Sequence, residues 1–210
     1  FLYLVEQPPA EDPTALSAWE LASRLSYFLW SSMPDDELFA AAASAKLSSP
    51  EQLLQQVDRM LADPRSEAFI ENFAGQWLGL REVGANPPVP SLYPRYDRHV
   101  EISMVSEAKA FFAEILDNDL DVRNFISSDF VVVNERLARF YGIDGVRGDH
   151  FRRVSVPSGV NRGGLLTLGA MHTVTSNGTR TSPVLRGVWV LRTMLAADPG
   201  LPVANVGEIE

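Results

Sequence analysis

The chain has 210 residues, enough to bury a substantial core as one large domain or two small ones. Hydrophobic residues make up 46% and charged residues 21% of the sequence, a balance typical of globular proteins rather than disordered ones. The net charge is −9, and the basic residues are scattered among acidic ones, which disfavours nucleic-acid binding. The sequence contains no cysteine, which excludes disulfides, thiolate metal sites and covalent haem attachment within this segment.

No apolar run approaches the length of a membrane span, and no stretch has the pattern of a signal peptide. The chain begins with Phe1 rather than Met and ends at Glu210 after a loop without a closing element. We therefore expect this sequence to be a piece of a longer chain, truncated before a downstream segment, with any targeting signal outside it.

Hydrophobic periodicity and capping residues predict a series of helices in the first half of the chain. Ser17 and Glu20, three residues apart, form a capping box before apolar residues at helical spacing. Prolines at helix starts and short links predict an antiparallel array. Because Trp30, Phe73 and Trp77 lie on apolar faces, we expect all three to be core residues of this array. The predicted helices are 18–30, 35–45, 50–61 and one that begins after Asp63.

The second half is predicted to contain a long helix, a short strand and two closing helices. A proline-rich loop over 83–94 marks an internal boundary before them. Asn134 has the position of an N-cap, and Gly142 stops the short helix that follows. The predicted elements are helices over 97–117, 134–141, 162–172 and 183–196 and a strand over 151–156. The expected fold is mainly α, an irregular multi-helix array with a short β element.

The stretch 173–192 combines hydroxyl side chains, an Asn-Gly turn signal and the start of a helix. Pro183 suits the first helical position, with Ser182 or Thr181 as the N-cap. Two interpretations stay open: the hydroxyls only cap and turn the chain while the arginines pair with carboxylates, or hydroxyls, arginines and free N–H groups bind an anion. The candidate anion-binding residues are Ser176, Asn177, Arg180, Thr181, Ser182 and Arg186.

Arg186 lies one turn inside the predicted helix, so its side chain is expected to lean back toward the capping hydroxyls. A cation at that end opposes the helix dipole, and a compensating partner is therefore expected. We favour a buried Glu or Asp of the first module as this partner; a bound anion such as a haem propionate is the other option.

The three histidines lack the spacing of metal ligands, so no metal site is predicted. His172 directly precedes the hydroxyl-rich stretch and is the candidate for a haem contact or an acid/base role, although a solvated or hydrogen-bonded histidine is the commoner case. His99 and His150 are expected at the surface. Glu107 falls on a mostly apolar helix face, where a partly buried carboxylate either has a raised pKa or pairs with an arginine.

Several stretches carry longer motifs. They are ELASRLSYFLWSSMPDDEL (20–38), NFAGQWL (72–78), NERLA (134–138), YGI (141–143), RGGLL (162–166) and TSPVLRG (181–187) with Trp189. Together they resemble the uncharacterised domains of unknown function that occur beside c-type cytochrome segments in large exported proteins of Planctomycetes and related bacteria. Phe140, where we expect His, and His172, where we expect an aliphatic residue, depart from that pattern.

The resemblance implies two adjoining modules: a helical module over 1–145, with a sub-boundary at 83–95, and a second module over 146–210 that contains the Thr-Ser-Pro-Arg motif. It implies flanking cytochrome-type domains as partners in the same polypeptide, with haem c bound there and no cofactor in this segment. It implies an exported protein, periplasmic or in the cell envelope, but no reaction, so catalytic residues and enzymatic activity stay open.

Two functions are therefore considered. The first is a non-catalytic or cofactor-contacting central module of an exported, cytochrome c-linked redox protein, an electron-transfer protein or an oxidoreductase. The alternative is a module that binds an anionic ligand such as a sulfated or uronic polysaccharide.

Overall fold

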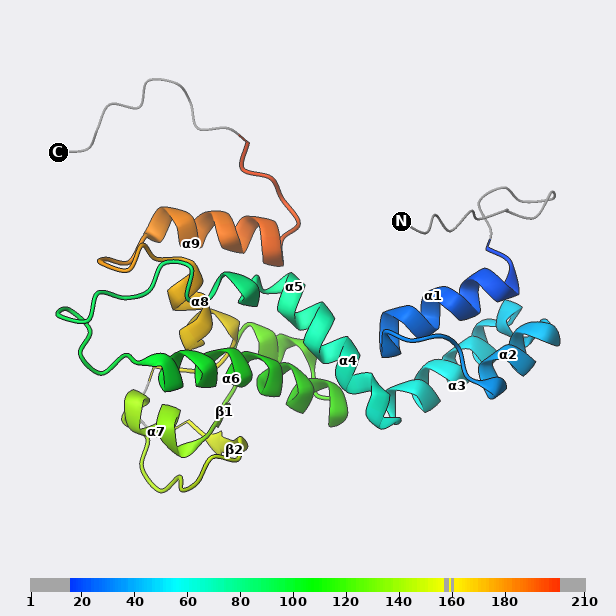
Figure 1. Ribbon diagram of the computed structural model, residues 1–210, viewed down its shortest axis with the longest axis horizontal. Coiled ribbons are helices and arrows are strands. Elements are labelled where there is room, and N and C mark those ends of the chain that lie inside the picture. Colours follow the sequence, from blue (N-terminus) through cyan, green and yellow to red (C-terminus); the bar gives the residue numbers. More distant parts are fainter. Residues whose placement is uncertain (1–15, 157–158, 160, 201–210) are drawn as a thin grey trace. The chain divides into compact units, whose positions relative to one another are not determined.

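The computed structural model describes residues 16–156, 159 and 161–200. The chain divides into two compact units, Phe1–Phe73 and Ala74–Glu210, called here the first and second unit (Figure 1). Helices dominate the described residues, and a two-stranded antiparallel sheet accompanies them. The predicted mainly α fold with a short β element is confirmed. The units and the predicted modules 1–145 and 146–210 divide the chain at different places, and the modules stay a prediction.

The first unit is built from α1 (Ala18–Trp30), α2 (Asp36–Ala43) and α3 (Pro50–Leu61), with a 3₁₀ turn at Lys46–Ser48 between the last two. The capping box predicted before α1 is present: the Ser17 hydroxyl accepts from the Glu20 N–H, and the Glu20 carboxylate accepts from the Ser17 N–H at 2.8 Å. The three helices follow the ranges predicted from the sequence to within two residues.

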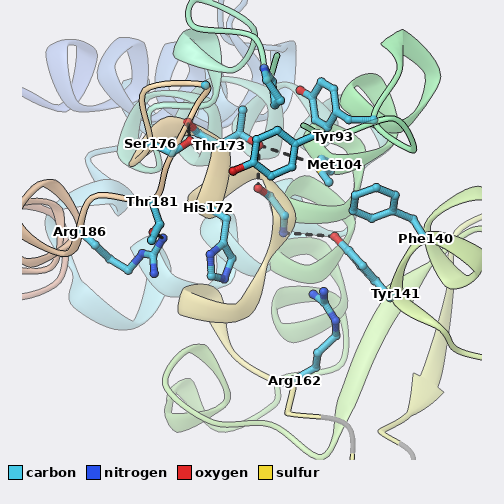
Figure 2. A pocket seen from close by; sticks show the side chains of 14 residues that line it. Tyr93, Met104, Phe140, Tyr141, Arg162, His172, Thr173, Ser176, Thr181 and Arg186 are labelled. Carbon is cyan, nitrogen blue, oxygen red and sulfur yellow. Dashed lines mark hydrogen bonds between the residues drawn. The ribbon is translucent and has the colours of Figure 1, made fainter. Parts of the chain in front are cut away.

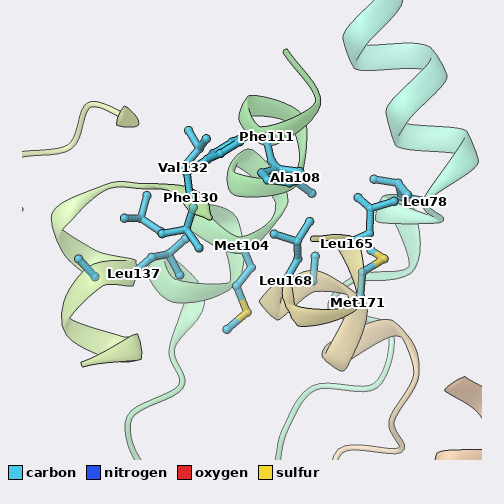
Figure 3. Close-up of a cluster of buried hydrophobic side chains, with 14 of the residues drawn as sticks. Leu78, Met104, Ala108, Phe111, Phe130, Val132, Leu137, Leu165, Leu168 and Met171 are labelled. Carbon is cyan, nitrogen blue, oxygen red and sulfur yellow. The ribbon is translucent and has the colours of Figure 1, made fainter. Parts of the chain in front are cut away.

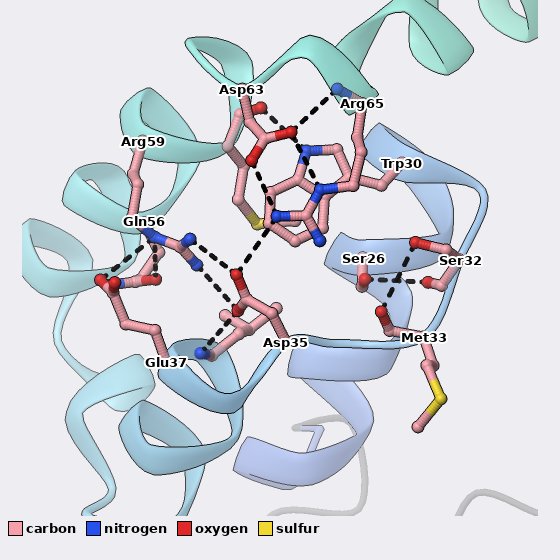
Figure 4. Close-up of polar contacts among 12 residues, drawn as sticks. Ser26, Trp30, Ser32, Met33, Asp35, Glu37, Gln56, Arg59, Asp63 and Arg65 are labelled. Carbon is pink, nitrogen blue, oxygen red and sulfur yellow. Dashed lines mark hydrogen bonds and ion pairs between the residues drawn. The ribbon is translucent and has the colours of Figure 1, made fainter.

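Trp30 anchors the first unit and is 3% exposed, as predicted for a core residue. Its indole N–H donates to the Met60 carbonyl at 2.9 Å and so joins α1 to the end of α3. The Arg65 guanidinium lies 3.5 Å from the centre of the indole ring, and both Arg59 and Arg65 pair with Asp35 (Figure 4). A buried ring and a shared carboxylate thus hold three helical segments together.

The fourth predicted helix is irregular. It runs through a 3₁₀ turn (Pro64–Ser66), α4 (Glu67–Phe69), a π-helical turn (Ile70–Ala74) and α5 (Gly75–Trp77).

Phe73 is 38% exposed, so its predicted place in the core is wrong. Phe73 lies in the π-helical turn and stays beside Phe69, with the two ring centres 5.1 Å apart. Another ring neighbour, Phe28, is itself exposed, so Phe73 lies at the rim of this aromatic cluster and not in its interior. Trp77 is partly buried against the core of the second unit, and its indole N–H donates to the Thr193 carbonyl at 2.9 Å. Trp30 and Trp77 therefore belong to different units and not to one array.

The second unit is organised on α6 (Arg98–Asp117), which Asp97 caps by accepting from the Val100 N–H at 2.8 Å. The remaining helices are α7 (Glu135–Tyr141), α8 (Gly169–Val174) and α9 (Pro183–Trp189), the last continued by a π-helical turn (Val190–Met194). Single 3₁₀ turns lie at Leu80–Glu82, Val122–Phe125 and Leu165–Thr167.

The continuous helix predicted over 162–172 is wrong in its first part. Gly163 and Gly164 have φ angles of +114° and +87°, so the chain turns there instead of entering a helix. A Cβ atom at either residue would also overlap the backbone carbonyl groups of Ser128 or Ile126. The chain therefore passes close to the segment before the sheet, and α8 begins only at Gly169.

The sheet pairs β1 (Phe130–Val133) with β2 (Arg152–Ser155), from Phe130 opposite Ser155 to Val133 opposite Arg152. The strand predicted over 151–156 is confirmed, whereas β1 was not predicted. All four β1 residues are buried. Four consecutive apolar residues without alternation do not distinguish a buried strand from another buried segment.

The core of the second unit lies between the inner face of α6, strand β1 and helix α8 (Figure 3). Its fully buried side chains include Leu78, Phe111, Phe130, Leu137, Leu165 and Leu168. Within the described part of the chain, no helix is both long and apolar enough to cross a membrane. The packing of α7 and α8 against α6 fixes the side chains that line the candidate site.

Candidate ligand-binding site

The second unit contains a pocket of about 330 Å³ beside α6, α7 and α8 (Figure 2). Two loops, 85–96 and 175–182, complete its walls. The lining residues are Pro88, Tyr93, Tyr96, Met104, Phe140, Tyr141, Arg162, Gly169, His172, Thr173, Ser176, Gly178, Thr181 and Arg186. This set contains two arginines, a histidine and three tyrosines but no acidic residue.

His172 lines the pocket and is exposed there, so its pKa reflects the charges nearby. Partial burial lowers the pKa of His172, and the positive charges of Arg186 and Arg162 lower it further. Both guanidiniums therefore act on the same imidazole, which is neutral at pH 7. In a chain with a net charge of −9, these residues form a local positive site.

Arg186 turns back toward the start of α9, as predicted. Its Nη2 donates to the Thr181 hydroxyl at 2.8 Å, and its Nε donates to the Thr175 hydroxyl at 3.3 Å. Ser182, rather than Thr181, caps the helix by accepting from the Leu185 N–H at 3.3 Å. Within residues 16–156, 159 and 161–200 no carboxylate pairs with Arg186, so the favoured Glu or Asp partner is absent there, and the guanidinium keeps donors for another acceptor.

The remaining predicted residues divide between the pocket and the turn beside it. Ser176, Thr181, Arg186 and His172 line the pocket, whereas Asn177, Arg180 and Ser182 do not. The Asn177 side-chain oxygen accepts from the backbone N–H groups of Thr179 and Arg180, at 3.2 and 3.0 Å. Asn177 therefore shapes the turn that presents its neighbours.

The loop 85–96 forms another wall of the pocket and is hydrogen-bonded to the turn around residues 177–180. The Val89 N–H donates to the Gly178 carbonyl at 2.9 Å, and the Tyr93 hydroxyl donates to the Thr179 carbonyl at 3.2 Å. Gly178 has a φ of +81°, and a Cβ atom there would lie 2.6 Å from the Pro87 carbonyl oxygen. The close approach of the two loops thus requires glycine at this position.

Glu107 lies behind the pocket and is fully buried on α6. Its Oε2 accepts from the Tyr141 hydroxyl at 2.6 Å and from the Gly169 N–H at 3.4 Å, while its Oε1 has no hydrogen-bond partner among the residues that the structure describes. Burial raises the pKa of Glu107 to about 7, although the Tyr141 hydrogen bond and the charge of Arg162 act in the opposite direction. Among the described residues the direct side-chain partner of Glu107 is Tyr141 and not an arginine, which agrees with the option of a raised pKa.

Arg162 connects this buried carboxylate to the pocket. Its guanidinium carbon lies 3.3 Å from the centre of the Tyr141 ring, and its Nη1 donates to the Thr167 carbonyl at 2.7 Å. Sequence reasoning did not select Arg162 or Tyr141, because they lie in motifs about twenty residues apart. Phe140 and His172, the two positions that depart from the resemblance, both line this pocket.

Guanidiniums and hydroxyls suit the binding of a carboxylate or sulfate group, because both are donors to anionic oxygens. No cluster of three or more His, Cys, Asp or Glu side chains arranged to hold a metal lies in the described ranges. The arrangement is thus one for holding an anionic group beside aromatic rings.

Two family models match the chain. The model described as "Protein of unknown function (DUF1592)", with the short name PSD4, matches residues 16–143. The model described as "Protein of unknown function (DUF1588)", with the short name PSCyt3, matches residues 162–210. No curated protein and no solved structure matches the chain.

Proposed function

The chain belongs to the DUF1592 family of proteins of unknown function, and we propose that it is a non-catalytic module that binds an anionic group in the pocket of the second unit. One observation carries this proposal: Arg162 and Arg186 line the same pocket, and none of the described residues that line it with them is acidic. Charge-assisted hydrogen bonds from guanidinium to carboxylate or sulfate are among the stronger polar contacts in proteins.

The tyrosines of the pocket favour an anion attached to a ring. Tyr93, Tyr96 and Tyr141 line the same space as the two arginines. Aromatic side chains offer flat apolar area with a polar tip, which suits a planar or ring-shaped group. The proposed ligand is therefore a ring compound that bears a carboxylate or sulfate.

In the leading version, the anionic group is a haem propionate from a neighbouring cytochrome-type domain of the same polypeptide. The short name PSCyt3 and the resemblance to cytochrome-linked exported proteins support this context. The two guanidiniums fit propionate groups, and His172 faces the same space. The chain would then be a cofactor-contacting part of an electron-transfer protein in the periplasm or cell envelope, with haem c attached outside this segment.

In the second version, the ligand is a sulfated or uronic polysaccharide. The tyrosine-lined pocket favours this version, because aromatic rings can pack on sugar rings while arginines bind their acidic groups. Both versions share the chemistry of a carboxylate or sulfate held by Arg162 and Arg186.

Titration of the chain with glucuronate, heparin and ferric protoporphyrin at low and high salt tests the proposal. Binding is expected to weaken as salt rises. Arg162→Ala and Arg186→Ala are each expected to weaken it about ten- to hundredfold, the range for a hydrogen bond to a charged group. Arg180→Ala removes the same charge outside the pocket and serves as the matched control.

The dimethyl ester of protoporphyrin, which lacks the propionate charges, separates the two versions. Loss of porphyrin binding on esterification, together with a reduction potential shifted by Arg186→Ala in the full-length protein, supports the haem version. Binding of the two sugars alone supports the polysaccharide version. Equal losses in Arg180→Ala and Arg186→Ala would show unspecific attraction and contradict the proposal.

A further inference from the structure

Tyr141 joins a buried carboxylate to the pocket. Its side chain lines the pocket (Figure 2). Its hydroxyl donates to Glu107, behind the pocket, at 2.6 Å. Glu107 itself does not line the pocket, and its second oxygen, Oε1, is buried without a partner in the described part of the chain. The side chain through which a bound anion can affect the hydrogen bonding of Glu107 is therefore that of Tyr141, beside the backbone N–H of Gly169.

The direction of the hydrogen bond between these two residues depends on one proton. When Glu107 is ionised, it has only acceptors, so the Tyr141 O–H must point toward it. When Glu107 is protonated, its own O–H can donate to the Tyr141 oxygen, and the Tyr141 hydrogen is free to turn toward the pocket. The Gly169 N–H, 3.2 Å from the Tyr141 oxygen, holds that oxygen in place in both states.

We propose that Glu107 takes up one proton when an anion binds in the pocket, and that Tyr141 then donates its hydroxyl hydrogen to the anion. This inference rests on the proposed function. One proton moves from solvent to a Glu107 oxygen, the anion keeps its charge, and only hydrogen bonds are exchanged. The site thus binds its ligand and one proton together. Tyr141 favours ligands that can accept a hydrogen bond from its hydroxyl.

The polar groups that face Glu107 are two hydrogen-bond donors and one positively charged arginine. Tyr141 approaches from α7, the Gly169 N–H from α8, and Arg162 from the segment before α8. Strand β1, which also packs on α6, contributes only the apolar residues 130–133.

Arg162 links the charge of the pocket to Glu107. Its positive charge favours the ionised form of Glu107, and the same guanidinium lines the pocket. An anion that pairs with Arg162 offsets that positive charge and adds a negative one nearby. Both changes favour protonation of Glu107. Because burial already raises the pKa of Glu107 to about 7, the carboxyl is close to balance at neutral pH and a modest change alters its proton occupancy.

His172 is a second group whose proton occupancy rises when an anion enters. Burial lowers its pKa most, the charges of Arg186 and Arg162 lower it further, and an anion offsets these two charges. The contribution of Glu107 must therefore be separated from that of His172. Glu107→Gln removes only the carboxyl titration and keeps the shape of the side chain. His172→Asn removes only the imidazole titration.

The test is calorimetric titration of the chain with glucuronate, and in parallel with ferric protoporphyrin, in buffers of different ionisation enthalpy at pH 7.5. The wild type is expected to take up a large fraction of one proton per bound anion. This uptake is expected to fall sharply in Glu107→Gln and in Tyr141→Phe but to persist in His172→Asn. The control is Glu101→Gln, which removes a second buried carboxylate of α6. Glu101 accepts from Tyr96 and pairs with Arg98, and its replacement is expected to leave uptake unchanged.

The affinity of the wild type is expected to fall by up to tenfold per pH unit above pH 7, and that of Glu107→Gln to vary less. Binding with the same proton uptake in the wild type and in Glu107→Gln would overturn this inference and leave the proposed function standing. Absence of binding for both probes would instead overturn the proposed function, and this inference with it. Circular dichroism confirms that each variant is folded before titration.

Discussion

A Cβ atom on Gly169 would lie 2.5 Å from the hydroxyl oxygen of Tyr141, much closer than non-bonded atoms approach. It would also lie 2.7 Å from Cγ of Met104. The absence of a side chain at the first residue of α8 therefore lets the Tyr141 hydroxyl reach Glu107.

Gly169→Ala is expected to destabilise the second unit by about 1–3 kcal/mol, the usual range for overpacking a core. The measurement is urea unfolding followed by circular dichroism. Gly187→Ala is the matched control, because this helical glycine has nothing within 4 Å of an added Cβ atom. There, alanine is expected to stabilise the helix by about 0.5–1 kcal/mol. Equal free energies of unfolding for the two variants would contradict the packing described here.

Glu107 makes stability depend on pH between about 4.5 and 7. Its pKa is raised from 4.5 to about 7 on folding, so the folded chain binds more protons than the unfolded chain in this window. Stability from this group is fully present below pH 4.5 and is lost as pH rises through 7, a total of about 3 kcal/mol at 1.36 kcal/mol per pKa unit.

The free energy of unfolding of the wild type minus that of Glu107→Gln, measured at pH 5 and at pH 8, isolates this effect. His172 titrates in the same window with the opposite sign, because its pKa is lowered on folding, but it is present in both proteins and cancels. The difference is expected to favour the wild type more at pH 5 than at pH 8. A difference that is constant with pH would show that Glu107 does not titrate in this window.

Trp30→Ala is expected to destabilise the first unit by about 3–5 kcal/mol, because the ring is 3% exposed and its removal leaves a cavity. The loss also leaves the Met60 carbonyl without its indole donor. Trp19, which is 52% exposed, offers a control of equal size, and Trp19→Ala is expected to cost much less. Thermal unfolding of both variants tests this difference. Similar losses of stability in the two variants would contradict it.

Gly178→Ala is expected to weaken anion binding, because a Cβ atom would push the turn away from the Pro87 carbonyl. The control variant is Gly145→Ala, which introduces the same backbone strain without the clash. Gly145 has a φ of +84°, close to the +81° of Gly178, but no described atom lies within 4 Å of its added Cβ atom. Both variants are expected to lose about 1–2 kcal/mol of stability from the left-handed conformation. Only Gly178→Ala is expected to lose affinity for glucuronate, and an equal loss in Gly145→Ala would speak against the loop contact.

Local signals in the sequence were enough to predict most helices. The capping box at Ser17 and the N-caps at Asn134 and Ser182 are short-range devices, and the structure confirms each one. Features that depend on longer-range packing were not predictable in this way. Phe73 was misplaced because helical spacing does not show that its aromatic cluster ends at an exposed rim. Strand β1 was missed because a fully buried strand has no alternating pattern.

The candidate site was predictable only in part. His172, Thr181 and Arg186 lie within fifteen residues of one another, so a local motif indicated them. Arg162, Tyr141 and Glu107 come from three separate segments, and only the packing of α7 and α8 on α6 brings them together. Glu107 carried a signal of its own, an acidic residue on an apolar helix face, but its tyrosine partner is 34 positions away.

The contacts of loop 85–96 with the turn at 178–179 have a thermodynamic consequence for recognition. Because the chain itself supplies the hydrogen bonds at Gly178 and Thr179, the conformational entropy of both loops is lost on folding and not on association. A ligand therefore meets a pre-organised wall. Association is expected to be a single fast step without a slow rearrangement, and differences in affinity among related anions are expected to appear mainly in their dissociation rates.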